Sequence, residues 1–361
     1  MSKTVMVIFG GSSPEYQVSL QSACNIISAL REAAYAVVRV GITQTGGWYR
    51  FEGPDDQIKN DTWQDSVIQP KSCNGICSPR DFVASVCGSV PDCIFPAVHG
   101  VNCEDGALQG FLTLTRIPYV GSKVLASAAC MDKAHTRRLF HEAGLPQCRY
   151  TTATRREILN DVEAISRHVA THIGYPCFLK PNNGGSSIGT RRVADPSELL
   201  DGLQYVSRYD PVVLIESFVK AREIEVSVLG DEAPILGLIG EIVTNQSVDY
   251  YDYDAKYVNA DDAAVVIPAL LDDRTEQLIR RYALTAYRCA GCSGLARIDF
   301  FIDQADGSVY LNEINTLPGF TAISVYPKSF TAAGMPMPEL VRRLCEDAIQ
   351  YENARSRQEI K

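Results

Sequence analysis

The sequence lacks two features that would indicate membrane or nucleic-acid association: a long hydrophobic run and an excess of positive charge. None of its 361 residues belongs to an apolar stretch near the roughly 18 residues that a transmembrane helix needs. Lys and Arg number 34 against 43 Asp and Glu, which gives a net charge of −9. We therefore expect neither nucleic acid nor a membrane as a partner, although a local basic pocket for phosphates remains compatible with this charge.

Two common nucleotide-binding motifs are also missing. The turn Gly10–Glu15 follows the first apolar run but lacks the Gly-x-Gly-x-x-Gly pattern of dinucleotide-binding folds. The Gly-Lys-Ser/Thr end of a P-loop occurs nowhere in the chain. A hydride-transfer enzyme built on the N-terminal unit would therefore lack its expected phosphate-binding turn.

Twelve cysteines do not by themselves predict disulfides in this chain. The N-terminal apolar run Val5–Phe9 is too short for the core of a secretion signal. Only Cys289 and Cys292 have C-x-x-C spacing, and no second such pair stands where a zinc site would need it. We expect reduced, mostly buried thiols and a cytoplasmic protein.

The order of apolar runs predicts a fold of the α/β and α+β classes with three units. Residues 1–125 alternate strands with helical patterns, which indicates a parallel sheet covered by helices. Within them, residues 44–90 are interpreted as hairpins and loops, and 117–120 as a closing strand. Residues 126–212 form a small central unit that begins with one helix over 127–143. Residues 213–361 form a strand-rich unit with single strands over 235–242, 296–302 and 308–314 and a polar loop at 244–262.

A predicted hairpin in the last unit carries the clearest candidate site. Side chains alternate along a strand, and a turn over 303–307 would place Asp299 opposite Glu313 and Arg297 opposite Asn315. Two carboxylates that face each other across strands repel, unless a divalent cation lies between them. Oxygen ligands of this kind suit Mg²⁺ that is held partly by phosphates. A solvated outer strand face is the alternative.

A second candidate site is suited to phosphate groups. Lys180 ends an apolar strand, and a loop that contains Gly184, Ser186, Ser187 and Gly189 follows it. Glycines and serines allow backbone N–H groups to approach phosphate oxygens closely. A plain turn is the alternative, but the strand-end lysine and the separate magnesium site favour phosphate binding.

Acidic residues follow the central unit in a pattern that suits a nucleoside. Glu216 ends an apolar strand, and Glu223 and Glu225 share one face of the next strand. The backbone near Glu216 could accept a hydrogen bond from an adenine amino group, and Glu223 could bind a ribose. A solvated strand face is the alternative.

Loops after two N-terminal strands carry further polar residues. His99 and Glu104 follow one strand, where the carboxyl ends of parallel strands commonly form a ligand crevice. Glu15 precedes the first helix, so it could either cap that helix or face a ligand amine.

Taken in order, these segments resemble the D-alanine–D-alanine ligases of the ATP-grasp superfamily. The resemblance extends from Phe9 to about Leu344 and depends on seven motifs. The motifs are Glu15-Tyr16-Gln17-Val18-Ser19, His99-Gly100 with Glu104-Asp105-Gly106, Cys130-Met131-Asp132-Lys133, Lys180-Pro181 with Gly185-Ser186-Ser187, Tyr253-Asp254-Ala255-Lys256-Tyr257, Gly294-Leu295-Ala296-Arg297-Ile298-Asp299, and Asn312 to Thr321.

The resemblance implies an ATP-grasp fold, in which an N-terminal domain is followed by central and C-terminal domains with ATP between them. It implies that ATP phosphorylates the carboxylate of a first D-alanine and that the amine of a second attacks the acyl phosphate. The product, D-Ala-D-Ala, would serve peptidoglycan synthesis. Two Mg²⁺ ions, with Mn²⁺ as a substitute, and a homodimer are implied as well.

The same resemblance implies roles for individual residues. The metal ligands would be Asp299, Glu313 and Asn315, and the ATP contacts would be Lys133, Lys180, Ser186, Ser187, Glu216, Val219 and Glu223. The substrate contacts would be Glu15 and His99 for the first D-alanine, Lys256, Ser324 and Val325 for the second, and Arg297 with the Gly319 N–H for the oxyanion. Glu15, Ser186 and Tyr257 would connect the 244–262 loop to the site as a lid.

The second substrate separates the subfamilies. Relatives of the vancomycin-resistance type make D-Ala-D-lactate or D-Ala-D-serine. Lys256-Tyr257 disfavours lactate, and the aliphatic Val325 suits a methyl group better than a hydroxyl, so we expect D-alanine, with D-serine as the alternative. Cys103 stands where several relatives have glycine and receives no function. A nucleotide-binding protein without turnover is a further alternative, but the complete metal-ligand set argues against it.

Overall fold

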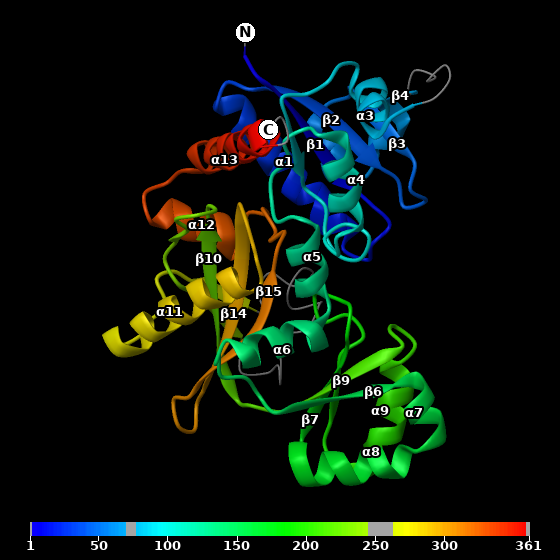
Figure 1. Cartoon of the computed structure of the whole chain (residues 1–361), viewed down its shortest axis with the longest axis vertical. Helices are drawn as coiled ribbons and strands as arrows, with labels where there is room; N and C mark the ends of the chain where they lie inside the picture. Colours follow the sequence, from blue (N-terminus) through cyan, green and yellow to red (C-terminus); the bar gives the residue numbers. More distant parts are fainter. Residues whose placement is uncertain (1, 70–76, 245–262, 359–361) are drawn as a thin grey trace.

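The computed structural model describes residues 2–69, 77–244 and 263–358, which form three regions around a junction (Figure 1). The first region contains a five-stranded sheet in the order β4-β3-β2-β1-β5, with β1 parallel to β2 and β5. Its strands are β1 (Thr4–Gly10), β2 (Ala36–Ile42), β3 (Trp48–Phe51), β4 (Val67–Ile68) and β5 (Cys93–Pro96). Its helices are α1 (Tyr16–Glu32), α2 (Asp55–Lys59), α3 (Pro79–Cys87) and α4 (Ala107–Thr115).

Two helices from the end of the chain complete the hydrophobic core of the first region. They are α12 (Val325–Ala332) and α13 (Met337–Gln358), and α13 lies against α1 and β5 (Figure 1). Leu340 and Leu344 of α13 are fully buried in the same cluster as Val7 and Ile27. The apolar stripe of α13 therefore joins the two ends of the sequence into one core.

The central region is a four-stranded antiparallel sheet in the order β6-β9-β7-β8. Its strands are β6 (Tyr150–Thr154), β7 (Cys177–Pro181), β8 (Arg191–Val193) and β9 (Val212–Ser217). Its helices are α7 (Arg155–Asn160), α8 (Val162–His168) and α9 (Leu199–Val206), and α5 (Val124–Met131) and α6 (Lys133–Glu142) connect it to the first region. β9 leads directly into the third region, so the two sheets adjoin at the junction.

The third region is an antiparallel sheet in the order β13-β12-β10-β14-β15, with β11 paired to β10. Its strands are β10 (Ala221–Leu229), β11 (Ile235–Leu236), β12 (Gly240–Thr244), β13 (Ala263–Val266), β14 (Leu295–Asp303) and β15 (Val309–Asn315). Helix α11 (Asp273–Cys289) packs on β10, β14 and β15. It buries Ile279 and Ala283 against Ile298 and Phe300, while the other side chains of β14 face the junction.

The expected single helix over 127–143 is wrong, because the chain breaks into α5 and α6 at Asp132. Asp132 leaves the helical conformation with ψ 101°, and its side chain accepts a hydrogen bond from the His135 N–H at 2.8 Å. Asp is among the residues that favour such an N-cap. The break places Lys133 in the first turn of α6, next to the loop that follows β7.

Three other sequence-based expectations differ from the structure. Residues 44–90, interpreted as hairpins and loops, also contain α2 and α3. The segment 117–120 is not a strand among the described elements but makes one parallel bridge, between Tyr119 and Ile94. The strand expected over 235–242 is divided into β11 and β12, because its pairing with β10 shifts by one residue between Val228–Leu236 and Glu225–Gly240.

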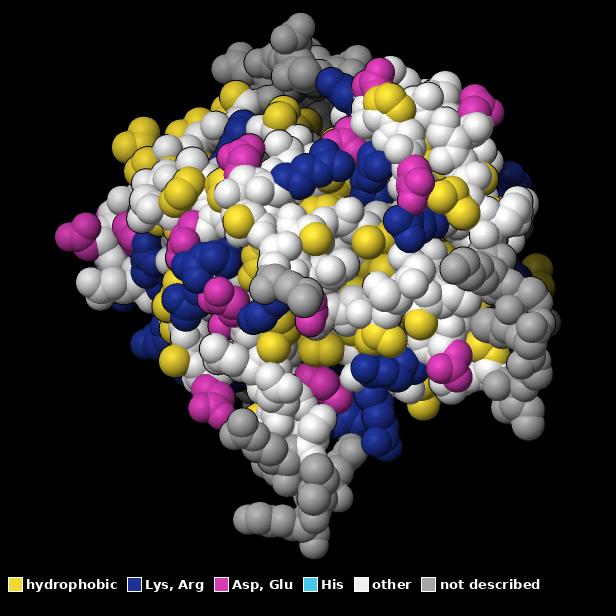
Figure 2. Space-filling view, turned by 90° about the horizontal axis from the view of Figure 1, so that it is seen from above, with side chains coloured by type: hydrophobic (Ala, Val, Ile, Leu, Met, Phe, Trp, Pro, Cys, Tyr) yellow, Lys and Arg dark blue, Asp and Glu magenta, His cyan; other side chains and the backbone are white. Residues whose placement is uncertain are grey.

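No helix in the described part of the chain has the length and apolar character needed to cross a membrane. Every cysteine in the described ranges is a free thiol, as the sequence analysis predicts. On the face seen in Figure 2, basic and acidic side chains are interspersed instead of forming one broad basic area.

Candidate active site

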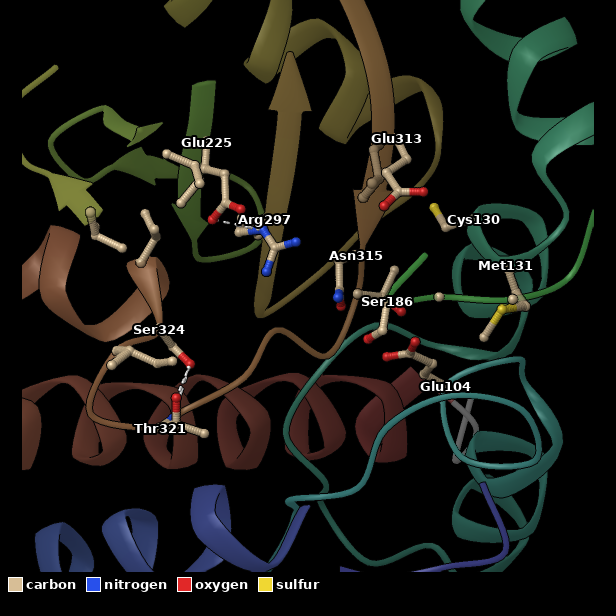
Figure 3. A pocket seen from close by; sticks show the side chains of 18 of the residues that line it. Glu104, Cys130, Met131, Ser186, Glu225, Arg297, Glu313, Asn315, Thr321 and Ser324 are labelled. Atoms are coloured by element: carbon tan, nitrogen blue, oxygen red, sulfur yellow. Dashed lines mark hydrogen bonds and ion pairs between the residues drawn. The ribbon is translucent and has the colours of Figure 1, made fainter. Parts of the chain in front are cut away.

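All three regions contribute side chains to a cavity of about 370 Å³ at their junction (Figure 3). Its lining includes Glu104 from the first region, Ser186 from the central region, and Arg297 and Glu313 from the third. The lining is mainly polar and charged, so the cavity is suited to an ionic ligand and not to an apolar one.

The hairpin β14–β15 has the register predicted from the sequence. Arg297 pairs with Asn315 and Asp299 with Glu313. Between Asp299 and Phe300 the register shifts by one residue, so a β-bulge separates these pairs from the turn. The bulge lets Asp299 and Glu313 face each other while the strands nearer the turn keep a different pairing.

Basic side chains accompany each carboxylate of this hairpin. The Arg297 guanidinium donates two hydrogen bonds of 2.8 Å to Asp299 and lies 3.1 Å from Glu225 Oε2. Lys133 Nζ is 3.4 Å from Glu313 Oε2. No three His, Cys, Asp or Glu side chains group as a metal site within the described ranges. Asp299, Glu313 and Asn315 could nevertheless hold Mg²⁺ if phosphate oxygens completed its ligands.

The loop after β7 brings the central region to the cavity. Ser186 and Ser187 have φ values of 52° and 57°, a left-handed conformation that is uncommon outside glycine and concentrates at functional sites. The Lys133 N–H donates to the Asn182 carbonyl at 3.1 Å, and Lys133 Nζ donates to the Gly184 carbonyl. This loop, α6 and the hairpin therefore meet around one lysine.

A buried charge cluster lies beside this loop. Glu216 pairs with Arg137, and the side chains of both are only 3% exposed. Lys180 Nζ donates to Glu216 Oε2 at 2.7 Å and to Asn312 Oδ1 at 3.5 Å. Burial alone would raise the pKa of Glu216, but Arg137 and Lys180 outweigh it and hold the pKa below its usual value. Glu216 is therefore an ionised hydrogen-bond acceptor, and Arg137 is a partner that the sequence analysis did not identify.

Glu15 connects the first and central regions. It precedes α1 but makes no side-chain cap, and its carboxylate instead accepts a hydrogen bond from Ser186 Oγ. The other carboxylate oxygen, Glu15 Oε2, lies close to the Gly100 backbone. A Cβ at position 100, where φ is +77°, would be only 2.5 Å from this oxygen, so the contact requires glycine. Of the two possibilities left open by the sequence, the structure therefore does not show the side-chain cap.

Comparisons with known proteins identify the family. Residues 4–122 match a family profile described as "D-ala D-ala ligase N-terminus", and residues 139–346 match one described as "D-ala D-ala ligase C-terminus". The chain belongs to the D-alanine–D-alanine ligase family. A D-alanine–D-alanine ligase from Ruminiclostridium cellulolyticum is 42% identical over 368 residues, covering 98% of this chain and 97% of that protein. One from Thermoanaerobacter sp. is 42% identical over 99% of each chain.

Solved structures from the same family superpose closely on this ligase-family chain. The VanG D-Ala:D-Ser ligase from Enterococcus faecalis has a TM-score of 0.82 and 33% identity, covering 96% of this chain and 100% of that one. The D-alanine–D-alanine ligase from Coxiella burnetii has a TM-score of 0.81 and 32% identity, covering 99% and 97%. These neighbours confirm the ATP-grasp architecture with its additional N-terminal domain, and the family is ATP-dependent.

His99, which the family resemblance places near the first substrate, has both ring nitrogens engaged within this ligase-family chain. Its Nδ1 lies 2.9 Å from the Leu317 carbonyl and its Nε2 lies 3.2 Å from Ser22 Oγ. A carbonyl only accepts, so Nδ1 carries the proton and Nε2 accepts from Ser22. Ser22 Oγ also accepts the Phe320 N–H at 3.0 Å. Burial lowers the pKa of His99 to about 4, so the ring is neutral and holds the 317–320 segment in place.

The remaining predicted residues lie on several elements of the ligase fold. Ser324, at the start of α12, accepts the Thr321 N–H at 3.0 Å, and Val325 follows it in the cavity wall. Gly319 lies in the same segment, where an added Cβ would be 2.9 Å from Ser324 Oγ. Glu223 lies on β10 and Val219 just before it, and Lys256 and Tyr257 lie outside the described residues.

Some residues of the cavity were not predicted as site residues. Glu104 and Glu225 line it. The sequence analysis placed Glu104 near a possible ligand crevice without a role, and noted Glu225 only as part of a strand face. Lys328 also lines it, one helical turn after Ser324 on α12, and no sequence signal indicated this short helix. Cys103 is not part of the cavity lining. Its sulfur packs against the Gly11 backbone, and burial raises the pKa of its thiol to about 12.

Proposed function

We propose that this chain joins two D-alanines in an ATP-dependent reaction through a D-alanyl phosphate, as the names of its relatives suggest. One observation carries the proposal. A single cavity is lined by Glu313 and Asn315 of β15, by Lys133, and by Ser186, which is bonded to Glu15 of the first region. Asp299 is the cross-strand partner of Glu313 at the edge of this set. A homodimer and a cytoplasmic location, both expected from the sequence analysis, are part of the same proposal.

The metal would bind at the hairpin. Asp299 and Glu313 are direct cross-strand neighbours, and Asn315 adds a neutral oxygen on the same strand face. This all-oxygen set with only two carboxylates fits Mg²⁺, which commonly takes its remaining ligands from phosphates and water. When bound, two such ions would neutralise the charge that develops on the phosphate oxygens.

ATP would lie between the central and third regions. Lys180 lies on β7 just before the serine-rich loop, and Lys133 donates to the Gly184 carbonyl within it. The backbone of Ser186 and Ser187 would approach the phosphates. The rings of Phe178 and Phe218, 5.8 Å apart, offer an apolar wall near Glu216. Because Glu216 is ionised and buried, it would hold Lys180 in position beside the nucleotide.

The same residues would position both amino acids for reaction. Glu15 would bind the ammonium of the first D-alanine, whose carboxylate would face the phosphoryl group. The amine of the second D-alanine would then attack the acyl phosphate, which releases phosphate. Arg297 and the Gly319 N–H would stabilise the developing oxyanion, and Ser324 would bind the second carboxylate. Lys256 and Tyr257 would extend this set as part of a lid that excludes water.

D-alanine is our choice for the second substrate, with D-serine as the alternative. Val325 is buried in the cavity wall near Ile242 and Val265, and an aliphatic wall of this kind suits a methyl group better than a hydroxyl. D-serine could still be used, because a pocket that discriminates between two substrates by one hydroxyl reaches a selectivity of only about 100-fold. The similarity to the structure of a D-Ala:D-Ser ligase is the reason that D-serine, and not another amino acid, is the alternative.

The test is Mg²⁺-dependent ADP release with D-alanine alone, D-alanine plus D-serine, and D-alanine plus D-lactate, with the products identified by mass. We expect release with D-alanine alone and D-Ala-D-Ala as the main product. D-Ala-D-Ser as the main product of the mixture would keep the ligase and refute the interpretation of Val325. Absence of ADP release with every pair, from folded protein, would refute the proposed function and favour a binding protein.

A further inference from the structure

Glu104 is a buried carboxyl group whose role the family assignment leaves open. Its residue is only 8% exposed, yet its side chain lines the cavity. The Gly100 backbone hydrogen-bonds the carboxyl group, while Oε2 is buried and has no hydrogen-bond partner among the described residues. A buried polar atom without a partner is costly, so this oxygen is a place where a ligand donor would be stabilising.

The Glu104 side chain is directed toward other residues that line the cavity. In Figure 3 its oxygens lie toward Ser186 and Asn315. Ser186 donates to Glu15, and Glu15 is the largest charged influence on Glu104. Glu15 and Glu104 also both approach Gly100. Two carboxyl groups thus converge on one small space next to Gly100.

A second acidic group at this point is unfavourable without a cation. Burial and the charge of Glu15 both raise the pKa of Glu104 well above its usual value. Two basic groups of the cavity have acidic partners of their own: Arg297 donates to Asp299, and Lys133 pairs with Glu313. The charge of Arg297 therefore offsets the rise in the pKa of Glu104 only in part. A cation that arrives with the substrate would therefore relieve the repulsion between Glu15 and Glu104.

We propose that Glu104 is a second anionic contact for the ammonium group of the first D-amino acid, opposite Glu15. The inference rests on the proposed function, because it takes its cation from that substrate. An ammonium group carries three donors. One would be bound by Glu15 and one by the unpartnered Oε2 of Glu104, so the amine would be fixed in two directions while the carboxylate faces ATP.

A helix-capping role does not account for Glu104. The capping contacts at the start of α4 come from Asp105, which accepts the Ala107 N–H at 3.1 Å, and from Gln109, which accepts the Gly106 N–H at 3.0 Å. The start of α4 is therefore capped by Asp105 and Gln109, and not by Glu104. The burial of Glu104 Oε2 without a hydrogen-bond partner in the described part of the chain is destabilising, and a ligand that donates to this oxygen would remove the penalty.

The test compares two carboxylates that differ only in the amine. Hydroxylamine traps the acyl phosphate as a hydroxamate, so hydroxamate formation from D-alanine and from propionate isolates the first half-reaction. We expect E104Q to lower kcat/KM for D-alanine about 10- to 100-fold and to leave propionate unchanged. Glu142→Gln, an exposed residue at the end of α6, is the control and should change neither substrate.

Calorimetric binding of D-alanine in the presence of ADP provides a second measurement that does not need turnover. We expect E104Q to weaken D-alanine binding by the same factor and to leave ADP binding unchanged. Equal losses for D-alanine and propionate, or unchanged D-alanine binding in E104Q, would refute the role of Glu104. If the wild-type protein neither binds D-alanine nor forms its hydroxamate, the proposed function fails, and this inference fails with it.

Discussion

The buried His99 predicts a specific dependence of stability on pH. The ring is neutral in the folded protein because burial lowers its pKa from 6.5 to about 4. In the unfolded chain the ring takes up a proton near its ordinary pKa of about 6.5. The unfolded state therefore binds more protons than the folded state between these values. This contribution to stability is fully present above the unfolded pKa and is lost as the pH falls toward the folded pKa.

The magnitude follows from the two pKa values. Their difference, at about 1.36 kcal/mol for each pH unit, gives a total effect of about 3 kcal/mol. About 2 kcal/mol of it should be lost between about pH 7 and about pH 5. The His99→Gln variant has no imidazole to titrate, so its stability should not show this loss.

Tryptophan fluorescence is a suitable assay for this comparison. The chain has two tryptophans, Trp48 on β3 and the fully buried Trp63, and both pack in the first region together with His99. Urea unfolding of the wild-type protein and H99Q at the two pH values gives the change in free energy for each. The exposed His141→Gln is the control and should behave as the wild-type protein. A difference between wild type and H99Q that does not change with pH would refute the reasoning.

Two further predictions concern charged groups near the nucleotide and metal positions. The Arg137→Leu variant leaves the buried Glu216 carboxylate with only Lys180 to compensate its charge. The variant should therefore be about 3 kcal/mol less stable and should have a higher KM for ATP. An unchanged thermal unfolding temperature would contradict the importance of the Arg137–Glu216 pair. Asp299→Asn should lower Mg²⁺-dependent ADP release by about 100-fold or more, whereas Asp306→Asn in the turn of the same hairpin should leave it unchanged. Similar Mg²⁺ dependence in the Asp299 variant and the wild-type protein would refute the metal assignment.

The sequence predicted the hairpin well because strand geometry is local and regular. Alternation with a period of two and an assumed turn centre placed Asp299 opposite Glu313. The pairs nearer the turn are offset by one residue from that assumption, and the bulge restores the predicted pair. The bulge between Asp299 and Phe300 was not predictable from this pattern, since it depends on how the twisted sheet packs. The motifs likewise indicated Glu15 and Ser186, but their mutual hydrogen bond joins residues from different regions.

Long-range packing explains most of what was missed. The break at Asp132 follows from a side-chain cap, for which the sequence contains a suitable residue but no decisive signal within a continuous helical pattern. Arg137 was unassigned because its partner Glu216 is 79 residues away. Glu104 was expected near a ligand crevice but received no role, because its significance depends on burial and on an oxygen without a partner.

The insertion of α13 into the core of the first region has a consequence for biosynthesis. A chain emerging from the ribosome presents β1, α1 and β5 early, but Leu340 and Leu344 of α13 lie near the carboxyl end of the sequence. Until they are translated, the apolar face between α1 and β5 has no cover. The first domain to be synthesised is therefore among the last to be finished. Truncation at the carboxyl terminus should damage the part of the molecule that begins the sequence.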